Sequence, residues 1–376
     1  MMMTKSTGGA GGLEGIVAGQ TAVCTLDGRM SYRGYTIEDL AAGAAYEEVA
    51  YLLLYGELPS RAALDAFRSR LGAAAELPAP IIDTLRALPP DAAMMDVMRT
   101  GCSMLAHFDA DVEDNGREAN LRKTERMLAR LPLIMATKHR FNTGRAFADA
   151  DPARSLAANI LRLVTDREPD AAAEQAMNVS LVLYAEHEFN ASTFTARCVA
   201  STLADLHCAI TAAIGALKGP LHGGANERVL EVLQQVGEPA NAEPWIRNAL
   251  ANKVRIMGFG HRVYKHGDPR TRIITPICGR LAAATGHEAM EQTAAVIEKF
   301  IVAEKGLPAN VDWPSARLYH YLGLPVQLYT PLFVCSRVAG WAAHAMEQYE
   351  NNRLIRPAAD YVGPGLREFV PLERRG

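Results

Sequence analysis

Apolar residues recur every three or four positions along most of the chain, which is the spacing of residues on one face of an α-helix. The segment Tyr46–Tyr55, with the sequence YEEVAYLLLY, shows this pattern clearly. Prolines separate the helical segments, because a proline inside a helix removes a hydrogen bond and breaks it. The pattern predicts amphipathic helices at Tyr46–Tyr55, Arg61–Leu71, Asn120–His139 and Ser155–Leu163.

Two longer segments, Ala171–Glu188 and Ser192–Leu217, contain few polar residues and many Ala, Ser and Thr. A helix that is apolar on most sides is typical of a buried position, so we expect these two at the centre of the fold. A third apolar helix is predicted for Pro331–Glu350. More charged helices are predicted between them, at Asn226–Gln235, Pro244–Asn252, Thr271–Thr285 and Glu288–Glu304.

Only one stretch indicates β-structure. Short runs at Val23–Leu26 and Met30–Tyr32 flank Asp27-Gly28, and Asp-Gly between two such runs is a strong hairpin signal. The chain is therefore predicted to be all-α, with a small N-terminal β-hairpin. Residues 1–12, which are mostly small and polar, are predicted to be a disordered lead.

Glycine-rich turns around Gly223, Gly258–Gly260 and Gly267 accompany the more charged helices that follow Leu217. We expect residues 224–327 to form a small domain, and residues 1–223 and 328–376 to form a large helical domain. From Arg353 onward Pro and Gly interrupt the chain, and this tail is predicted to rejoin the large domain.

The balance of charge excludes some classes of function. Lys and Arg number 39, Asp and Glu number 42, and the net charge is −3, which argues against a nucleic-acid or membrane-surface partner. Any anionic ligand must be met by a local group of basic side chains. Six scattered cysteines without a C-x-x-C pair indicate reduced thiols, and no apolar run reaches the roughly 18 residues of a membrane span. We therefore predict a cytoplasmic protein.

The stretch Gly219–Glu227 places His222 between a proline-containing turn and two glycines, just before a predicted helix. The first backbone N–H groups of a helix are unpaired and its dipole is positive there, which disfavours imidazolium. A neutral histidine in this position can donate a hydrogen bond to a carbonyl oxygen that is becoming an enolate. The pattern fits a glycine-rich helix cap equally well.

Two more histidines, His187 and His261, stand among carboxylates, Asn or Gly. A metal site is an alternative, but the three histidines lie on separate segments and no HExxH motif is present, so no metal is predicted. The turn Gly258-Phe259-Gly260 lacks the third glycine of a dinucleotide fingerprint. Its glycines are expected to let backbone amides approach a ligand.

Arg270, Arg337 and Arg356 are the basic side chains that stand out, and Arg337 lies inside an apolar helix. Internal salt bridges would explain each of them, and bidentate clamps for a small dicarboxylate would explain all three. Asp312 precedes Pro314, which can occupy the first turn of a helix. Asp312 is therefore either a helix cap or a general base.

Together these segments resemble the citrate synthase family, in particular its short bacterial dimeric type, from about Gly12 to the C-terminus. Several motifs in the family's order make the resemblance specific. They are EHEFNAST at 186–193, GPLHGGANE at 219–227, GFGHRVYKHGDPR at 258–270, NVD at 310–312, SRVAGW at 336–341 and NRLIRP at 352–357.

The resemblance implies a two-domain helical enzyme, active as a homodimer, that condenses oxaloacetate with an acyl-CoA in the tricarboxylic acid cycle. It implies that His222 donates to the thioester oxygen, that Asp312 removes the α-proton and that His261 polarises the oxaloacetate carbonyl. No metal or redox cofactor is implied, because coenzyme A enters as the thioester substrate.

The resemblance also assigns binding roles. Oxaloacetate would be held by His187, Arg270, Arg337 and Arg356, the last acting across the dimer interface. Coenzyme A would meet Gly258, Gly260 and Lys265.

Selectivity for the acyl group is the open choice. Beside Asp312 the chain has Trp313-Pro314-Ser315 in place of the family's usual aromatic-Tyr-Ser. One methylene is discriminated by only about 1–3 kcal/mol of pocket fit. We expect acetyl-CoA as the substrate, with propionyl-CoA also used. The alternatives are a 2-methylcitrate synthase that prefers propionyl-CoA and, more remotely, a non-catalytic acyl-CoA-binding protein.

Overall fold

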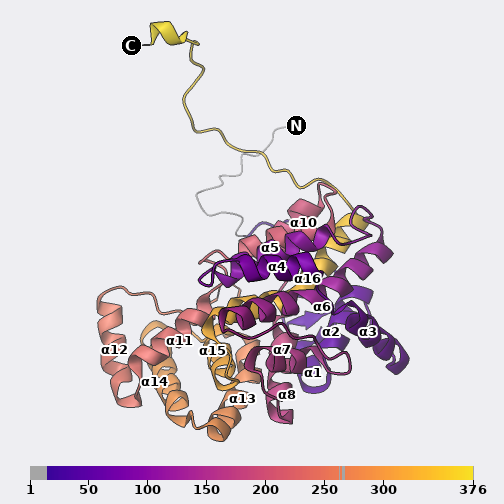
Figure 1. Ribbon diagram of the computed structural model, residues 1–376. Helices are drawn as coiled ribbons and strands as arrows, with labels where there is room; N and C mark the ends of the chain where they lie inside the picture. The colour runs from indigo at the N-terminus through magenta and orange to yellow at the C-terminus, as the bar shows by residue number, and fades with distance from the viewer. Residues whose placement is uncertain (1–14, 262, 265–266, 376) are drawn as a thin grey trace.

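The computed structural model describes residues 15–261, 263–264 and 267–375, and Figure 1 shows that the chain is almost entirely helical. The predicted all-α class is confirmed, and the predicted lead at 1–12 lies outside the described residues. The helices are α1 Ile37–Gly43, α2 Tyr46–Tyr55, α3 Arg61–Ala74, α4 Ala79–Ala87, α5 Met94–Ala106, α6 Arg117–Asn142, α7 Leu156–Thr165, α8 Ala171–Tyr184, α9 Ala191–Ala200, α10 Leu206–Leu217, α11 Ala225–Val236, α12 Pro239–Ala251, α13 Pro269–Thr285, α14 Glu288–Lys305, α15 Asp312–Tyr321 and α16 Tyr329–Glu350, with short 3-10 turns at η1 Val326–Leu328 and η2 Leu372–Arg374.

The predicted hairpin is present and is extended by a third strand. Strands β1 Cys24–Thr25 and β2 Ser31–Tyr32 pair antiparallel, with Cys24 opposite Tyr32. β2 also pairs with β3 Tyr35–Thr36. The turn between β2 and β3 contains Gly34 at φ 89°, a conformation that glycine adopts without steric cost.

The segment Ser192–Leu217 forms two helices, α9 and α10, and not the single helix that its apolar pattern predicts. Leu203 has a φ of 65°, which ends the helical path, and the Asp205 side chain accepts a hydrogen bond from Cys208 N at 3.0 Å and so caps α10. α12 likewise begins at Pro239 and contains Pro244. The predicted helix bounds were wrong at both places, because the cap Asp205 lies inside an apolar run and because α12 starts at Pro239 and not at Pro244.

The core of the first part is built around α16, which packs against α2, α6, α8, α9 and α10. Its buried residues include Trp341, with no exposed surface, and both neighbouring central helices are buried as predicted. Helices α11 to α15 pack mainly on one another, and Figure 1 shows them gathered at one end of the molecule. α13 and α11 link the two groups, through contacts with α8 and α16.

The tail leaves the helical body after a short anchored stretch. Asn352 and Ile355 form hydrogen bonds with Ser201, in the turn between α9 and α10. Beyond them the chain is exposed, and Figure 1 shows it running away from the body. The expectation that the tail rejoins the large domain was wrong beyond Ile355, where large apolar side chains such as Val362 and Leu366 are exposed within the described residues.

Candidate active site

The turn between α8 and α9, residues 185–190, is the structural centre of the candidate site. α8 ends at Tyr184, and Asn190 caps α9 by accepting a hydrogen bond from Thr193 N at 3.2 Å. Between them Glu188 has a φ of 50°, which is uncommon for a residue other than glycine. Three residues lie on or beside this turn, and each contacts a predicted site residue from another segment: Tyr184, His187 and Ser192.

His222 lies just before α11 and contacts the start of α9. Its Nε2 accepts a hydrogen bond from the backbone N–H of Ser192 at 3.2 Å and lies 2.8 Å from the Ser192 hydroxyl. An accepting Nε2 requires that the proton of the neutral ring sit on Nδ1. Burial, with a smaller contribution from the Arg337 charge, lowers the pKa of His222 to about 4. The ring is therefore neutral at pH 7, as the sequence predicted, although burial replaces the helix dipole as the main cause.

His261 and His187 face each other across the site. Their ring centroids lie 5.3 Å apart, and Tyr264 stacks on His261 at 4.6 Å. The Nδ1 atom of His261 accepts hydrogen bonds from the backbone N–H groups of Val263 and Tyr264, at 3.1 and 3.3 Å. The neutral ring then carries its proton on Nε2, which makes Nε2 a hydrogen-bond donor.

His187 is buried, with 8% of its surface exposed, and within the described part of the chain its Nε2 has no hydrogen-bond partner. Burial and the charges of Arg270 and Arg337 hold the pKa of His187 well below its usual value. A buried polar atom without a partner is costly unless a ligand or water completes it. His187 is thus positioned to contact a bound molecule.

Asp312 is the first residue of α15, and its side chain does not cap the helix, so the capping alternative was wrong. The Tyr184 hydroxyl instead donates a hydrogen bond to its Oδ1 at 3.2 Å. Burial raises the pKa of Asp312 to about 6, and the Arg270 charge and the Tyr184 hydrogen bond offset this only in part. A carboxylate whose pKa lies near neutrality is suited to accept a proton.

Arg270 and Arg337 lie next to these groups but differ in their partners. Arg270 forms hydrogen bonds with Asp268 through Nε at 2.9 Å and Nη2 at 2.7 Å, which confirms the internal salt bridge for this residue. Arg337 donates Nε to the Tyr184 carbonyl at 2.6 Å and lies over the Phe333 ring at 4.5 Å. Burial lowers the pKa of Arg337, and Glu186 counteracts this in part. Both side chains are almost fully buried.

The remaining predicted residues are not joined to this group by the described contacts. Arg356 is exposed on the tail, and among the described residues it has no hydrogen bond or ion pair to His187, Arg270 or Arg337. Lys265 lies outside the described residues. Gly258 has a φ of 89°, and a Cβ there would lie 2.8 Å from Val229 and 3.0 Å from Trp313. Close packing requires this glycine independently of any ligand.

The turn that contains Gly258 and Gly260 is fixed against the segment before α15. The Gly260 N–H donates to Pro308 O at 2.8 Å, and Asn310 N donates to Gly258 O at 2.9 Å. The turn thus couples the position of His261 to that of Asp312. Two residues that the sequence did not single out, Tyr184 and Ser192, provide the contacts to Asp312 and His222. Ser192 stands in the quoted motif, whereas Tyr184 looked like an ordinary core residue.

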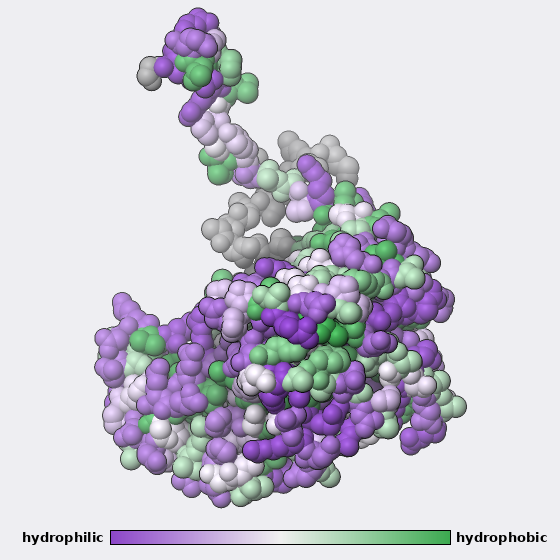
Figure 2. Space-filling model, viewed as in Figure 1, coloured by the Kyte–Doolittle hydropathy of each residue, from purple (hydrophilic) through white to green (hydrophobic). Residues whose placement is uncertain are grey.

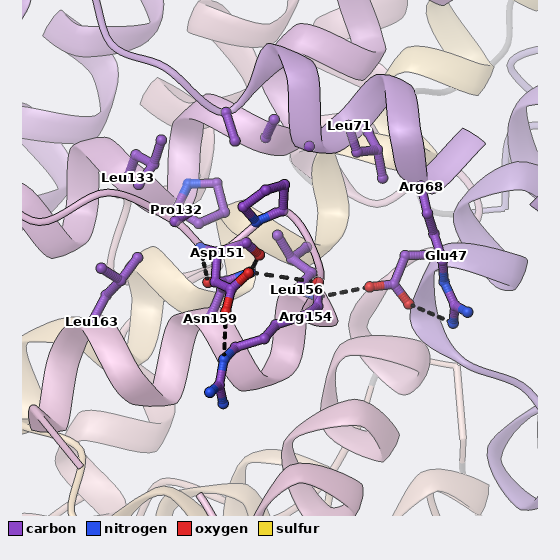
Figure 3. Close-up of a pocket in the computed structure, with 15 residues that line it drawn as sticks. Glu47, Arg68, Leu71, Pro132, Leu133, Asp151, Arg154, Leu156, Asn159 and Leu163 are labelled. Carbon is purple, nitrogen blue, oxygen red and sulfur yellow. Dashed lines mark hydrogen bonds and ion pairs between the residues drawn. The ribbon is translucent and has the colours of Figure 1, made fainter. Parts of the chain in front are cut away.

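A separate pocket lies between α3, α6 and α7, with about 520 Å³ of empty space. Figure 3 shows its apolar lining by Leu71, Pro132 and Leu163, and the carboxylate of Glu47 between Arg68 and the backbone N–H of Leu156. All its lining residues precede Val164 in the chain. It therefore contains none of the predicted site residues.

Within the described residues no group of three or more His, Cys, Asp or Glu side chains is arranged to hold a metal ion. All six cysteines are free thiols, as predicted. No helix in the same part of the chain is both long enough and apolar enough to cross a bilayer.

Comparison with known proteins gives one consistent result. Residues 12–358 match the family model described as citrate synthase, C-terminal domain. A 2-methylcitrate synthase of Shewanella oneidensis is 44% identical over the full length of both chains, and citrate synthase 2 of Bacillus subtilis is 44% identical over 97% of this chain and 98% of its own.

Solved structures agree with the sequence comparison. The citrate synthase of Thermoplasma acidophilum, solved as a ternary complex with carboxymethyl coenzyme A and oxaloacetate, superposes with a TM-score of 0.91 at 34% identity, covering 97% of this chain and 98% of its own. The citrate synthase of Pyrobaculum aerophilum gives a TM-score of 0.90 at 36% identity, covering 97% and 95%.

Proposed function

The chain belongs to the citrate synthase family, and from that premise we propose how its side chains divide the work of condensing oxaloacetate with an acyl-CoA, with acetyl-CoA preferred and propionyl-CoA also accepted. The enzyme is an acyltransferase. One observation supports the proposed assignment most directly: His222, His261 and Asp312 each contact a residue of the segment 184–192. These contacts support a site at which two imidazoles and one weak carboxylate meet the substrates.

The first step is removal of a proton from the carbon next to the thioester. The carboxylate of Asp312 takes this proton, and the Nδ1–H of His222 donates to the thioester oxygen as negative charge develops on it. A donor aimed at such an oxygen typically lowers the barrier by about 2.7–4 kcal/mol. The low pKa of His222 keeps the ring neutral, so that it donates a hydrogen bond and does not neutralise the base.

The second step joins the two substrates. The enolate carbon attacks the oxaloacetate carbonyl carbon while the Nε2–H of His261 donates to the carbonyl oxygen, which becomes a hydroxyl. Water then adds to the thioester carbonyl carbon and gives one proton back to the His261 ring, and coenzyme A leaves as the thiol with the proton that Asp312 had taken. Each proton moves between substrate and a side chain of this protein, and the proposed chemistry uses no cofactor beyond the coenzyme A thioester itself.

Oxaloacetate is proposed to be held by His187, Arg270 and Arg337, with Arg356 supplied by a second subunit. The unpartnered Nε2 of His187 supports this, because it lies among the charges of both buried arginines. Asp268 occupies Nε and Nη2 of Arg270, which leaves Nη1 to face a carboxylate. Coenzyme A is proposed to meet Lys265 and the backbone at Gly258 and Gly260. Since Gly260 N–H is engaged by Pro308, Gly258 N–H is the better candidate donor.

A homodimer is proposed because the C-terminal tail exposes large apolar side chains to solvent. Large apolar side chains along it are exposed, and Figure 2 shows apolar residues on the arm that projects from the body. They include Leu354, Tyr361, Val362, Leu366 and Phe369, with exposed fractions from 57% to 109%. Patches of this kind mark a protein interface. We propose that the tail lies on the partner subunit and carries Arg356 to its site.

A mixed dimer tests the shared site. An Arg356→Ala subunit paired with a His222→Ala subunit should recover activity at one of its two sites, because one site then receives both intact residues. Each homodimer variant alone should be much less active. Mixed dimers no more active than the variants would refute the crossing tail.

We also propose residues 224–327 as a small domain that closes on residues 1–223 and 328–376. The packing of α11 to α15 mainly on one another supports this division. Closure would exclude bulk water, which competes for the hydrogen-bond donors before the two substrates have joined. Small-angle scattering with and without oxaloacetate tests it. The radius of gyration should decrease on binding, and an unchanged value would contradict closure. A cytoplasmic location is proposed from the free thiols.

The alternative is a 2-methylcitrate synthase, because relatives with that name and with the name citrate synthase are equally similar at 44% identity. Thiol release measured with oxaloacetate and either acetyl-CoA or propionyl-CoA decides between them. The preferred reading requires a higher kcat/KM with acetyl-CoA. A higher value with propionyl-CoA would establish the alternative, and no release with either would leave a non-catalytic acyl-CoA-binding protein.

A further inference from the structure

Tyr184, the last residue of α8, is a buried phenol to which the proposed chemistry gives no role. It has 1% of its surface exposed, and its ring packs edge-on against Phe333 at 4.7 Å. Its hydroxyl lies 3.2 Å from Oδ1 of Asp312 and 2.8 Å from Oγ of Ser315. The hydroxyl thus connects the first part of the molecule to the start of α15.

The direction of these hydrogen bonds follows from the groups. A carboxylate can only accept, so the Tyr184 O–H donates to Asp312. That uses the single phenolic proton, and the Ser315 hydroxyl therefore donates to the Tyr184 oxygen at 2.8 Å, a shorter contact than its 3.4 Å hydrogen bond to the Asp312 backbone carbonyl. Burial holds the pKa of Tyr184 well above its usual value, so the phenol stays protonated wherever the enzyme is folded. Hydrogen bonds thus run from Ser315 to Tyr184 and from Tyr184 to Asp312, and the first polarises the second.

We propose that Tyr184 is a positioning residue for the base: its hydroxyl, supported by Ser315, holds Oδ1 of Asp312 and thereby presents Oδ2 to the α-proton of the acyl group. This inference rests on the proposed role of Asp312. A neutral donor suits the task. A cation in the same place would stabilise the carboxylate so strongly that it would be a poor base.

Other groups around Asp312 act on its charge but cannot orient it in the same way. From α13, the Arg270 charge lowers the pKa of Asp312 and the Asp268 charge raises it. These two are engaged with each other through two hydrogen bonds. From α14, Glu291 is paired with Arg317, one turn further along α15. Among these groups Tyr184 is the one whose hydrogen bond to the carboxylate is directed at a single oxygen.

A matched control exists in the same layer of the fold. The Tyr319 hydroxyl, on α15, lies 2.7 Å from the Ser180 hydroxyl on α8, and both side chains are buried. Tyr319→Phe therefore removes a buried phenol that bridges the same two helices without contacting Asp312. A general effect of loosening α8 against α15 would appear in Tyr319→Phe and Tyr184→Phe alike.

The experiment compares Tyr184→Phe, Tyr319→Phe and the parent enzyme by kcat, by the KM for oxaloacetate, and by the acid limb of kcat/KM against pH. Tyr184→Phe should lower kcat about tenfold, the size of one hydrogen bond to a charged group, and move the acid limb upward by about 0.5–1 pH unit. The KM for oxaloacetate should change less than about twofold, since Tyr184 is proposed to act only through Asp312. Tyr319→Phe should leave the acid limb in place.

Two results would overturn the proposal: an acid limb that is unmoved in Tyr184→Phe, or an equal movement in Tyr319→Phe. Should Tyr184→Phe not fold, Ser315→Ala decides, because it leaves the phenol in place and weakens it as a donor. A smaller upward movement is then expected, and none would overturn the proposal. A comparison of kcat in the parent enzyme and in Asp312→Asn tests the proposed base independently of Tyr184. Substantial turnover in Asp312→Asn would show that Asp312 is not the base.

Discussion

The starts of α13 and α15 lie against each other, and each carries an aspartate whose chemistry is opposite to that of the other. Asp268 precedes α13 and is bound to Arg270, which lowers its pKa although burial alone would raise it. Asp312 begins α15 and is held by a neutral phenol, so burial prevails and its pKa rises to about 6. The partner's charge, and not the residue type or the place at a helix start, separates a structural carboxylate from a reactive one.

The same distinction extends to His222. His222 is held by the uncharged Ser192 and keeps a low pKa, whereas a carboxylate partner would have stabilised its cation. Groups that must change protonation or donate to a developing charge have neutral partners here. Arg270, which is proposed to hold oxaloacetate, is instead fixed by a full charge, the carboxylate of Asp268.

Replacing Asp312 by Asn should produce the largest effect on turnover. The amide cannot accept the α-proton, and loss of a general base typically costs about 10²–10⁴-fold in rate. Oxaloacetate affinity, measured by calorimetry, should remain close to that of the parent, because Asp312 is not among the proposed oxaloacetate ligands. A variant with near-normal kcat would show that another group is the base.

The same substitution has a second, independent consequence for stability. The pKa of Asp312 is raised on folding from about 3.8 to about 6, so the charged form is penalised in the folded state. The protonated carboxyl carries no such penalty, so the stability of the folded protein is fully retained below pH 4 and decreases as the pH rises through 6. Asp312→Asn should therefore be more stable than the parent at pH 8, by at most about 3 kcal/mol, and similar at pH 4. Thermal unfolding at both pH values measures this.

Replacing Asp268 by Asn should have the opposite effect on stability: this variant should be less stable than the parent. The substitution leaves the buried Arg270 without its counter-charge, and breaking a buried ion pair costs about 3–5 kcal/mol, less whatever the amide retains by hydrogen bonding. The pKa of Asp268 is lowered on folding, so its contribution is present above pH 4 and lost as the pH falls. Asp268→Asn should unfold at a lower temperature than the parent at pH 7, and the difference should shrink toward pH 3.

Kinetics of Asp268→Asn should also separate the two aspartates. Arg270 would be less well fixed, so we expect a KM for oxaloacetate raised about tenfold with a smaller change in kcat. Equal stability and equal KM in parent and variant would mean that the Asp268–Arg270 pair has no special role. The comparison between the two helix starts would then fail.

The pH dependence of the parent enzyme tests the difference between Asp312 and Asp268 without any substitution. The proposed mechanism requires Asp312 as the carboxylate, so kcat/KM should fall as the pH drops through about 6 and should level off above it. His222 stays neutral until about pH 4 and should not contribute to this limb. If kcat/KM instead fell only below pH 5, the pKa of Asp312 would not be raised to about 6, and Asp312 would resemble Asp268.

Sequence alone predicted the fold class and the hairpin, because both depend on local patterns that tertiary contacts did not override. It did not predict the third strand, which consists of Tyr35 and Thr36 alone, or the break before Asp205, since neither carries a strong local signal. The motif-bearing residues were visible as unusual surroundings for His and Arg. Tyr184 was not, because a tyrosine at the end of an apolar helix is typical of any core, and only the fold shows what its hydroxyl contacts.

Replacing Ser192 by Ala should have the smallest effect on turnover and tests whether a neutral partner is enough for His222. The backbone N–H of residue 192 remains and still donates to Nε2, so Nδ1 keeps its proton and kcat should fall less than about tenfold. Trp341 Nε1, which donates to the Ser192 hydroxyl at 3.1 Å, loses its acceptor in the core. Leaving this buried donor without an acceptor should lower the free energy of unfolding by about 1–3 kcal/mol, which a lower unfolding temperature would show. A fall in kcat of a hundredfold or more would show that the hydroxyl, and not the backbone, sets the state of the imidazole.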